Sequence, residues 1–208
     1  MWKPMLITFL AGYLLGNLNG AVCMSVLQGK ADVRSKGSGN AGLTNFVRNF
    51  GIAQALLVVL IDASKALIAC VTGGLLLQPY GYALEGMMLG GVAVSLGHDF
   101  PALLGFRGGK GILSGFTIAM TIDYRCGFIL LGIFAVSFLA TRYVSLSSIL
   151  GAIGFSVSFA VFYHHRIWVM LGGIFIGALA VFMHRSNIER LIKGTESRVT
   201  FGKKEQHP

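Results

Sequence analysis

The sequence predicts an all-α integral membrane protein of seven transmembrane helices, with the N-terminus outside and the C-terminus cytoplasmic. The first observation is composition: 54% of the 208 residues are hydrophobic, 12% are charged and the mean hydropathy is +0.72. This composition lacks the polar surface of a soluble domain. The second is that uncharged stretches recur, several as long as the roughly 20 residues that cross a bilayer as a helix, whereas β-barrel strands are short and alternating. The third is the placement of the Lys and Arg residues, most of which fall on one predicted side of the membrane.

The apolar stretches define the expected spans, which are residues 4–27, 52–77, 86–97, 111–122, 126–141, 143–163 and 167–183. The first follows a single lysine and lacks a convincing small-residue cleavage site, so we expect a retained helix. The fourth is short and typical of a re-entrant or partly buried helix. If it did not cross, the C-terminal tail with its six Lys and Arg would lie outside, against the positive-inside rule.

The formal net charge of +9 could indicate nucleic-acid binding, but cations between apolar spans more often report membrane orientation. With seven spans, 13 of the 17 Lys and Arg fall on the inner side, 3 fall on the outer side and Lys65 lies within a span. The inner cations are Lys30, Arg34, Lys36, Arg48, Arg107, Lys110, Arg142, Arg185, Arg190, Lys193, Arg198, Lys203 and Lys204. We therefore expect no nucleic-acid partner.

Two units are expected along the chain. Residues 1–185 form the membrane domain, and residues 186–208 form a short cytoplasmic helix and tail. Ser186 and Glu189 have the spacing of a capping box for that helix, and Gly194 can end it.

The loop after the first span is rich in groups that bind anions. Glycines allow backbone N–H groups to turn toward an anion, hydroxyl and amide side chains add donors, and Arg48 can hold two phosphate oxygens. The candidate phosphate ligands are Gly37, Ser38, Gly39, Asn40, Thr44 and Asn45. If Gly42 opens the next helix, that helix adds its N-terminal charge. The alternative is a flexible glycine turn; a dinucleotide fold is excluded because no apolar strand precedes the glycines.

The second inner loop again combines glycine with a cation, at Gly108, Gly109, Lys110 and Gly111. It is not a Walker A loop, because its glycine spacing is one residue short and a glycine replaces the magnesium-binding Ser or Thr. The backbone and Lys110 can still surround a phosphate at the start of the short fourth helix. His98 and Asp99 are adjacent and face different directions, so we expect His98 to be structural, bonded to a backbone carbonyl near Pro101.

Two further polar groups lie at or within the spans. His184, Arg185, Asn187 and Glu196 follow the last span; His184 can titrate near neutrality, although such residues can also be ordinary interfacial ones. Asp62 and Lys65 lie i, i+3 inside the second span, where ionisable groups are costly. We expect a structural ion pair there, with direct substrate contact as the alternative.

Taken in order, these motifs resemble the PlsY-type acyl-phosphate:glycerol-3-phosphate acyltransferases of bacteria, over nearly the whole chain. The matching segments are Gly37–Asn40 with Gly42, Thr44, Asn45 and Arg48; Gly97, His98, Phe100, Pro101 and Gly108–Gly111; Tyr143–Leu146; and His184, Arg185, Asn187, Ile188 and Gly194–Glu196. Asp62 and Lys65 also fit.

The resemblance implies an enzyme that moves a fatty acyl group from acyl phosphate to the sn-1 hydroxyl of glycerol 3-phosphate, giving lysophosphatidic acid for phospholipid synthesis. It implies catalytic roles for Ser38, Arg48, Lys110, His184 and Asn187, glycerol phosphate binding by the second-loop glycines, and an architectural Glu196. It implies neither metal nor other cofactor, no obligatory protein partner, and a multi-pass place in the bacterial inner membrane with the active site facing the cytoplasm. The proton acceptor is either His184 or a phosphate oxygen of the donor.

Two other functions are compatible with the same motifs. An organic-phosphate transporter could use the basic loops and the Asp62–Lys65 pair, but its cations should lie nearer mid-membrane. A divergent acyltransferase paralogue would share the motifs with an altered substrate.

Overall fold

The computed structural model describes residues 1–199; residues 200–208 of the predicted tail, which include Lys203 and Lys204, lie outside the described residues. Within residues 1–199 the regular elements are all helices. Its α-helices are α1 Trp2–Gly16, α2 Gly20–Leu27, α3 Leu43–Phe50, α4 Ala55–Leu77, α5 Ala83–Asp99, α6 Ile112–Ile122, α7 Tyr124–Thr141, α8 Val144–Phe162, α9 Ile167–Met183 and α10 Arg185–Ile192. Short 3₁₀ turns are η1 Val33–Ser35, η2 Gln78–Tyr80 and η3 Ala102–Leu104.

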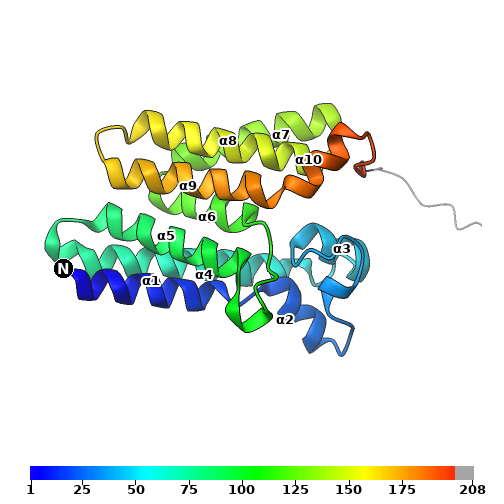
Figure 1. Ribbon diagram of the computed structural model, residues 1–208, viewed down its shortest axis with the longest axis horizontal. Coiled ribbons are helices and arrows are strands. Elements are labelled where there is room, and N and C mark those ends of the chain that lie inside the picture. The colour runs from blue at the N-terminus through cyan, green and yellow to red at the C-terminus, as the bar shows by residue number, and fades with distance from the viewer. Residues whose placement is uncertain (200–208) are drawn as a thin grey trace, which may run out of the picture.

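The long apolar helices identify an integral membrane protein. Four helices are long and apolar enough to span a membrane, and up to six spans result if each bent pair, α1 with α2 and α9 with α10, counts as one. The predicted short segment is the separate apolar helix α6. Figure 1 shows α1 and α4 to α9 running lengthwise, with α2, α3 and α10 gathered at the end away from the N-terminus.

The first apolar stretch is not one helix, as the sequence predicted, but two helices bent by 42°. Asn19 caps α2 by accepting a hydrogen bond from the Val22 N–H at 3.0 Å. Lys65 donates to the carbonyls of Gly16 and Leu18 at 3.3 and 2.7 Å. The break persists because these groups satisfy backbone atoms that a continuous helix would have paired.

The Asp62–Lys65 ion pair forms within α4, with Lys65 Nζ 2.8 Å from Asp62 Oδ1. The same carboxylate oxygen accepts the Gly20 N–H at 3.1 Å, so both charges contact the broken first segment. Both side chains are buried. The expected pair is therefore present and its surroundings show what it holds: the ends of α1 and α2.

Helices α1, α4 and α5 pack closely through small residues. A Cβ added at Gly90 of α5 would lie 2.1 Å from the Ala69 carbonyl oxygen, and one at Gly97 would lie 2.1 Å from that of Tyr13. Such contacts allow helix backbones to approach one another in a membrane, where apolar burial from water does not drive association.

Two local predictions differ from the structure. Gly42 does open a helix, but this helix is the separate α3 rather than the second span, which begins at Ala55. The predicted capping box is wrong: α10 begins two residues earlier, its N-cap is His184 rather than Ser186, and no side chain caps it. Glu189 instead pairs with Lys193 at 2.6 Å.

Candidate active site

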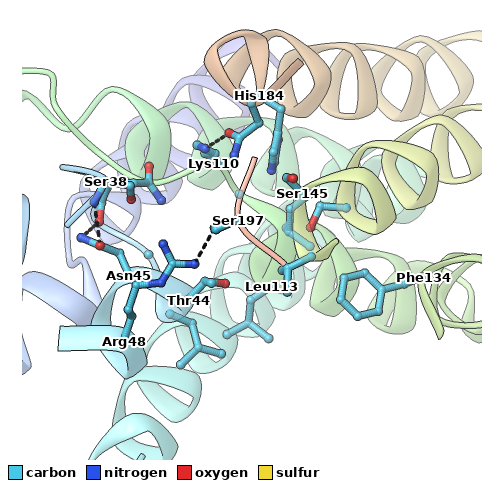
Figure 2. Close-up of a pocket in the computed structure, with 18 of the residues that line it drawn as sticks. Ser38, Thr44, Asn45, Arg48, Lys110, Leu113, Phe134, Ser145, His184 and Ser197 are labelled. Carbon is cyan, nitrogen blue, oxygen red and sulfur yellow. Dashed lines mark hydrogen bonds between the residues drawn. The ribbon is translucent and has the colours of Figure 1, made fainter. Parts of the chain in front are cut away.

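A cavity of about 630 Å³ lies where α3, α6, α7, α8 and α10 meet, and all three predicted polar clusters line it. Figure 2 shows side chains from these separate segments facing a common space. Of the predicted residues, the cavity wall includes Gly37, Ser38, Asn40, Thr44, Asn45, Arg48, Asp62, His98, Lys110, Gly111, His184, Asn187 and Glu196. Gly39, Lys65, Gly108 and Gly109 are not among the lining residues.

Asn45 organises the first loop from within. Its buried side-chain Nδ2 lies 3.0 Å from the carbonyl oxygens of Val33, Lys36 and Asn40, and its Oδ1 accepts the Ser38 N–H at 3.0 Å. These partners occupy the donors and the acceptor of the amide. The structure therefore gives Asn45 a role in holding the loop, where the sequence suggested a direct phosphate ligand.

One cavity wall comes from this loop and from α3. Ser38, Thr44 and the exposed Arg48 line the cavity, as does Gly42, the N-cap of α3. Gly37 and Gly39 have φ of +58° and +71°, a backbone conformation that favours glycine. The glycines thus shape the turn that presents Ser38, and the first turn of α3 adds its partial positive charge to the same wall.

The other wall carries Lys110, Asn187 and His184. Lys110 Nζ donates to Asn187 Oδ1, which connects the second inner loop to α10. Burial, together with the nearby charges of Arg190 and Arg185, lowers the pKa of Lys110 to about 8. Lys110 precedes Gly111, the N-cap of α6, so its charge adds to that of the helix N-terminus.

His184 is buried and neutral near pH 7, because burial lowers the pKa of its imidazole to about 4. Its Nδ1 lies 2.8 Å from the Ala180 carbonyl oxygen, which accepts but cannot donate. We therefore assign the proton to Nδ1, which leaves Nε2 as a hydrogen-bond acceptor.

Arg190 is a cavity residue that the motif reasoning missed. It donates from Nε to Glu196 Oε2 at 2.7 Å, while Asn187 donates to Glu196 Oε1 at 2.8 Å. Burial opposes ionisation of Glu196, but the hydrogen bonds from Asn187 and Arg190 outweigh it and lower the pKa of the carboxyl. The i, i+3 spacing of Asn187 and Arg190 on α10 is the signal that could have identified Arg190.

The second-loop glycines serve packing. A Cβ at Gly108 would lie 1.9 Å from the His98 carbonyl oxygen, and one at Gly109 would lie 2.1 Å from His98 Nε2. His98 Nδ1 lies 2.7 Å from Lys65 Nζ, rather than against the expected carbonyl near Pro101. Close packing of this loop on α5 therefore explains why both residues are glycine, and phosphate binding by Gly108 and Gly109 stays a prediction.

Beyond the polar walls the cavity is apolar. Its lining there includes Leu113 and Phe116 of α6, Leu130, Leu131 and Phe134 of α7, and Val144 of α8. These residues lie in the predicted spans. The sequence does not distinguish them from the other apolar residues there, and only the folded chain shows that they line the cavity. One cavity therefore combines a basic polar part with an apolar part.

Comparison with known proteins identifies relatives of this chain. A family model described as glycerol-3-phosphate acyltransferase matches residues 6–194. The glycerol-3-phosphate acyltransferase of Thermoanaerobacter pseudethanolicus is 38% identical over 193 residues, which are 93% of this chain and 94% of the relative. The corresponding protein of Shouchella clausii is 35% identical over 98% of this chain and 99% of its own.

Two solved structures share the fold. Crystal structures of PlsY, an integral membrane glycerol 3-phosphate acyltransferase, are similar to this chain in the glycerol 3-phosphate form, with a TM-score of 0.82 and 30% identity, and in the lysophosphatidic acid form, with a TM-score of 0.81 and 31% identity. The alignments cover 94% of this chain and 96% and 95% of those chains.

Proposed function

This chain belongs to the glycerol-3-phosphate acyltransferase family, and we propose that its cavity performs the family's acyl transfer with the residues described above. The enzyme transfers an acyl group from acyl phosphate to glycerol 3-phosphate and forms lysophosphatidic acid. One observation carries the assignment of the site: a single cavity has two walls with cationic side chains and an apolar part beyond them. Both substrates bear a phosphate, and one also bears a long apolar chain.

We assign one phosphate to each cationic wall. Arg48 and Ser38 with the α3 N-terminus form one anion site, and Lys110 with Arg190 and the α6 N-terminus forms the other. The acyl chain occupies the apolar part between α6, α7 and α8. Binding both substrates in one cavity aligns the hydroxyl with the acyl carbon.

In the transfer step, the sn-1 hydroxyl oxygen attacks the carbonyl carbon of the acyl phosphate and the bond from that carbon to the phosphate oxygen breaks. Phosphate leaves with the electron pair, and the nearby cations stabilise its growing charge. An imidazole with a pKa of about 4 holds a proton weakly, whereas a phosphate monoester has a second pKa of about 6. We therefore propose that His184 Nε2 orients the hydroxyl and that the departing phosphate takes its proton.

The membrane arrangement follows the charge distribution. We propose that α1 with α2, α4, α5, α6, α7, α8 and α9 are the seven crossings, with the N-terminus outside and the cavity at the cytoplasmic face of the bacterial inner membrane. The lengthwise course of α1 and α4 to α9 in Figure 1 supports this proposal, since α2, α3 and α10 lie together at one end.

The test uses purified enzyme in lipid with palmitoyl phosphate and labelled glycerol 3-phosphate. We expect labelled lysophosphatidic acid, and about a 10²- to 10³-fold lower kcat/KM for Lys110→Met because a preorganised charge is lost. Lys193→Met removes an equal charge from the exposed C-cap residue of α10 and should retain wild-type activity. Equal activity of Lys110→Met and Lys193→Met would overturn the proposed role of Lys110, and palmitoyl-CoA in place of palmitoyl phosphate tests the donor.

A further inference from the structure

The chain after α10 crosses the mouth of the cavity. We call residues 195–199 the C-terminal strap; Thr195, Glu196, Ser197 and Val199 all line the cavity. Figure 2 shows Ser197 at the cavity, joined to Arg48 by a hydrogen bond. The sequence predicts a tail here with an architectural Glu196, and the structure shows that Thr195, Ser197 and Val199 also form part of the cavity wall.

Both ends of the strap are anchored. At its start, the Thr195 N–H donates to the Arg190 carbonyl at 2.9 Å. At its end, the Val199 N–H donates to the Arg142 carbonyl at 3.0 Å, and the Arg198 guanidinium lies 4.8 Å from the ring centroid of Tyr143. The strap therefore links α10 to the corner between α7 and α8.

Within the strap, Ser197 contacts Arg48, one of the proposed phosphate-binding residues. Arg48 donates from Nη2 to Ser197 Oγ at 3.0 Å, across 149 positions of sequence. No carboxylate within residues 1–199 forms a salt bridge with Arg48. A guanidinium has five N–H donors, so one bond to a neutral hydroxyl can orient it and leave its charge and remaining donors for a phosphate.

We propose that Ser197 is a positioning residue that aims the Arg48 guanidinium into the cavity. Glu196, its neighbour, bonds Asn187 and Arg190 on the opposite wall. Glu196 thus holds groups of the wall that carries Lys110, and Ser197 holds Arg48 of the other wall. The strap therefore sets the distance between the two cationic walls. This inference rests on the phosphate-binding role of Arg48 proposed above.

The first test replaces the hydroxyl. Ser197→Ala should raise the KM of the substrate whose phosphate Arg48 binds, for a loss of about three- to tenfold in kcat/KM, the value of one hydrogen bond. Ser197→Thr keeps the hydroxyl and should restore most of this loss. Ser186→Ala, on the exposed face of α10, is the matched control. The melting temperature should be the same in all variants, because a merely structural role would lower it without a selective change in KM.

A second test shortens the chain. An enzyme that ends at Val199 keeps every strap contact described here and should behave as the full chain does. An enzyme that ends at Glu196 loses the Arg48, Arg142 and Tyr143 contacts, and its kcat/KM should fall about 10- to 100-fold.

The outcomes separate the strap from the proposed site. If Arg48→Ala is inactive while Ser197→Ala and the chain ending at Glu196 keep wild-type kinetics, the positioning role is overturned and the role of Arg48 stands. If Arg48→Ala itself keeps wild-type kinetics, both the proposed role of Arg48 and the inference about Ser197 are overturned.

Discussion

At the scale of single residues, burial decides what each polar group of the cavity can do. Arg48 lines the cavity with an exposed side chain. Lys110 and His184 are buried deeper, and burial shifts both pKa values toward the neutral form. The cavity therefore combines an exposed guanidinium, a lysine whose charge is lost in mild base and a histidine that is a neutral hydrogen-bond acceptor.

Lys110 gives a prediction on pH dependence. A free lysine stays charged to about pH 10, but the pKa of Lys110 is about 8, so its charge is present below pH 8 and is lost as the pH rises through that value. We expect kcat/KM, which reports the free enzyme, to fall tenfold per pH unit above about pH 8. In Lys110→Arg this fall should move to higher pH, whatever its activity at pH 7. A fall at the same pH in both enzymes would contradict the assignment.

The side chains that line the cavity were largely predictable from the sequence, because cations, hydroxyls and glycines concentrate in three segments on one predicted side of the membrane. The role of each individual side chain was less predictable. Asn45 is predicted as a phosphate ligand, yet its amide bonds its own loop; Gly108 and Gly109 are predicted as phosphate ligands, and the structure adds that both pack closely against His98. Composition cannot distinguish a donor turned toward a ligand from one turned toward the backbone.

At the scale of elements, hydropathy located the apolar segments but not the break in the first one. In the sequence, the break between Gly16 and Gly20 is marked by two polar side chains, Asn17 and Asn19. A hydropathy average over a span hides them. The break needs partners from elsewhere, above all Lys65 and Asp62 of α4. The ion pair predicted within a neighbouring span was the sequence signal that backbone groups left unpaired by a helix break lie nearby.

The packing of the second loop on α5 gives a prediction for stability. Gly109→Ala would place a Cβ 2.1 Å from His98 Nε2, and His98 cannot move freely because it is buried against Lys65. We expect a loss of about 1–3 kcal/mol of stability, measured as a lower melting temperature in detergent. Gly115→Ala in α6 is the control, since its Cβ meets nothing within 4 Å and should leave the melting temperature unchanged or raise it. Equal melting temperatures in both variants would mean that Gly109 is not a packing residue.

At the scale of the whole molecule, the parity of crossings brings the site together. The first loop, the second loop and the C-terminal segment reach one cavity only if an even number of lengthwise helices separates them. Helices α4 and α5 separate the first two, and α6 to α9 separate the second from α10. The short α6 is therefore as necessary to the arrangement as the longer helices.

The crossing by α6 can be tested with cysteine labelling. Cys23, Cys70 and Cys126 are first replaced by alanine, and single cysteines are introduced at Leu103 before α6 and at Tyr124 after it, both of which are exposed. In right-side-out membrane vesicles, a membrane-impermeant maleimide should label Tyr124→Cys directly and Leu103→Cys only after permeabilisation, because eleven residues of helix lie between the two sides. Tyr80→Cys, in η2 directly after α4, reports the outer face in the same vesicles. If Tyr124→Cys is labelled only after permeabilisation, α6 re-enters on the cytoplasmic side, the number of crossings becomes even, and the positive-inside assignment of the C-terminal tail must be reversed.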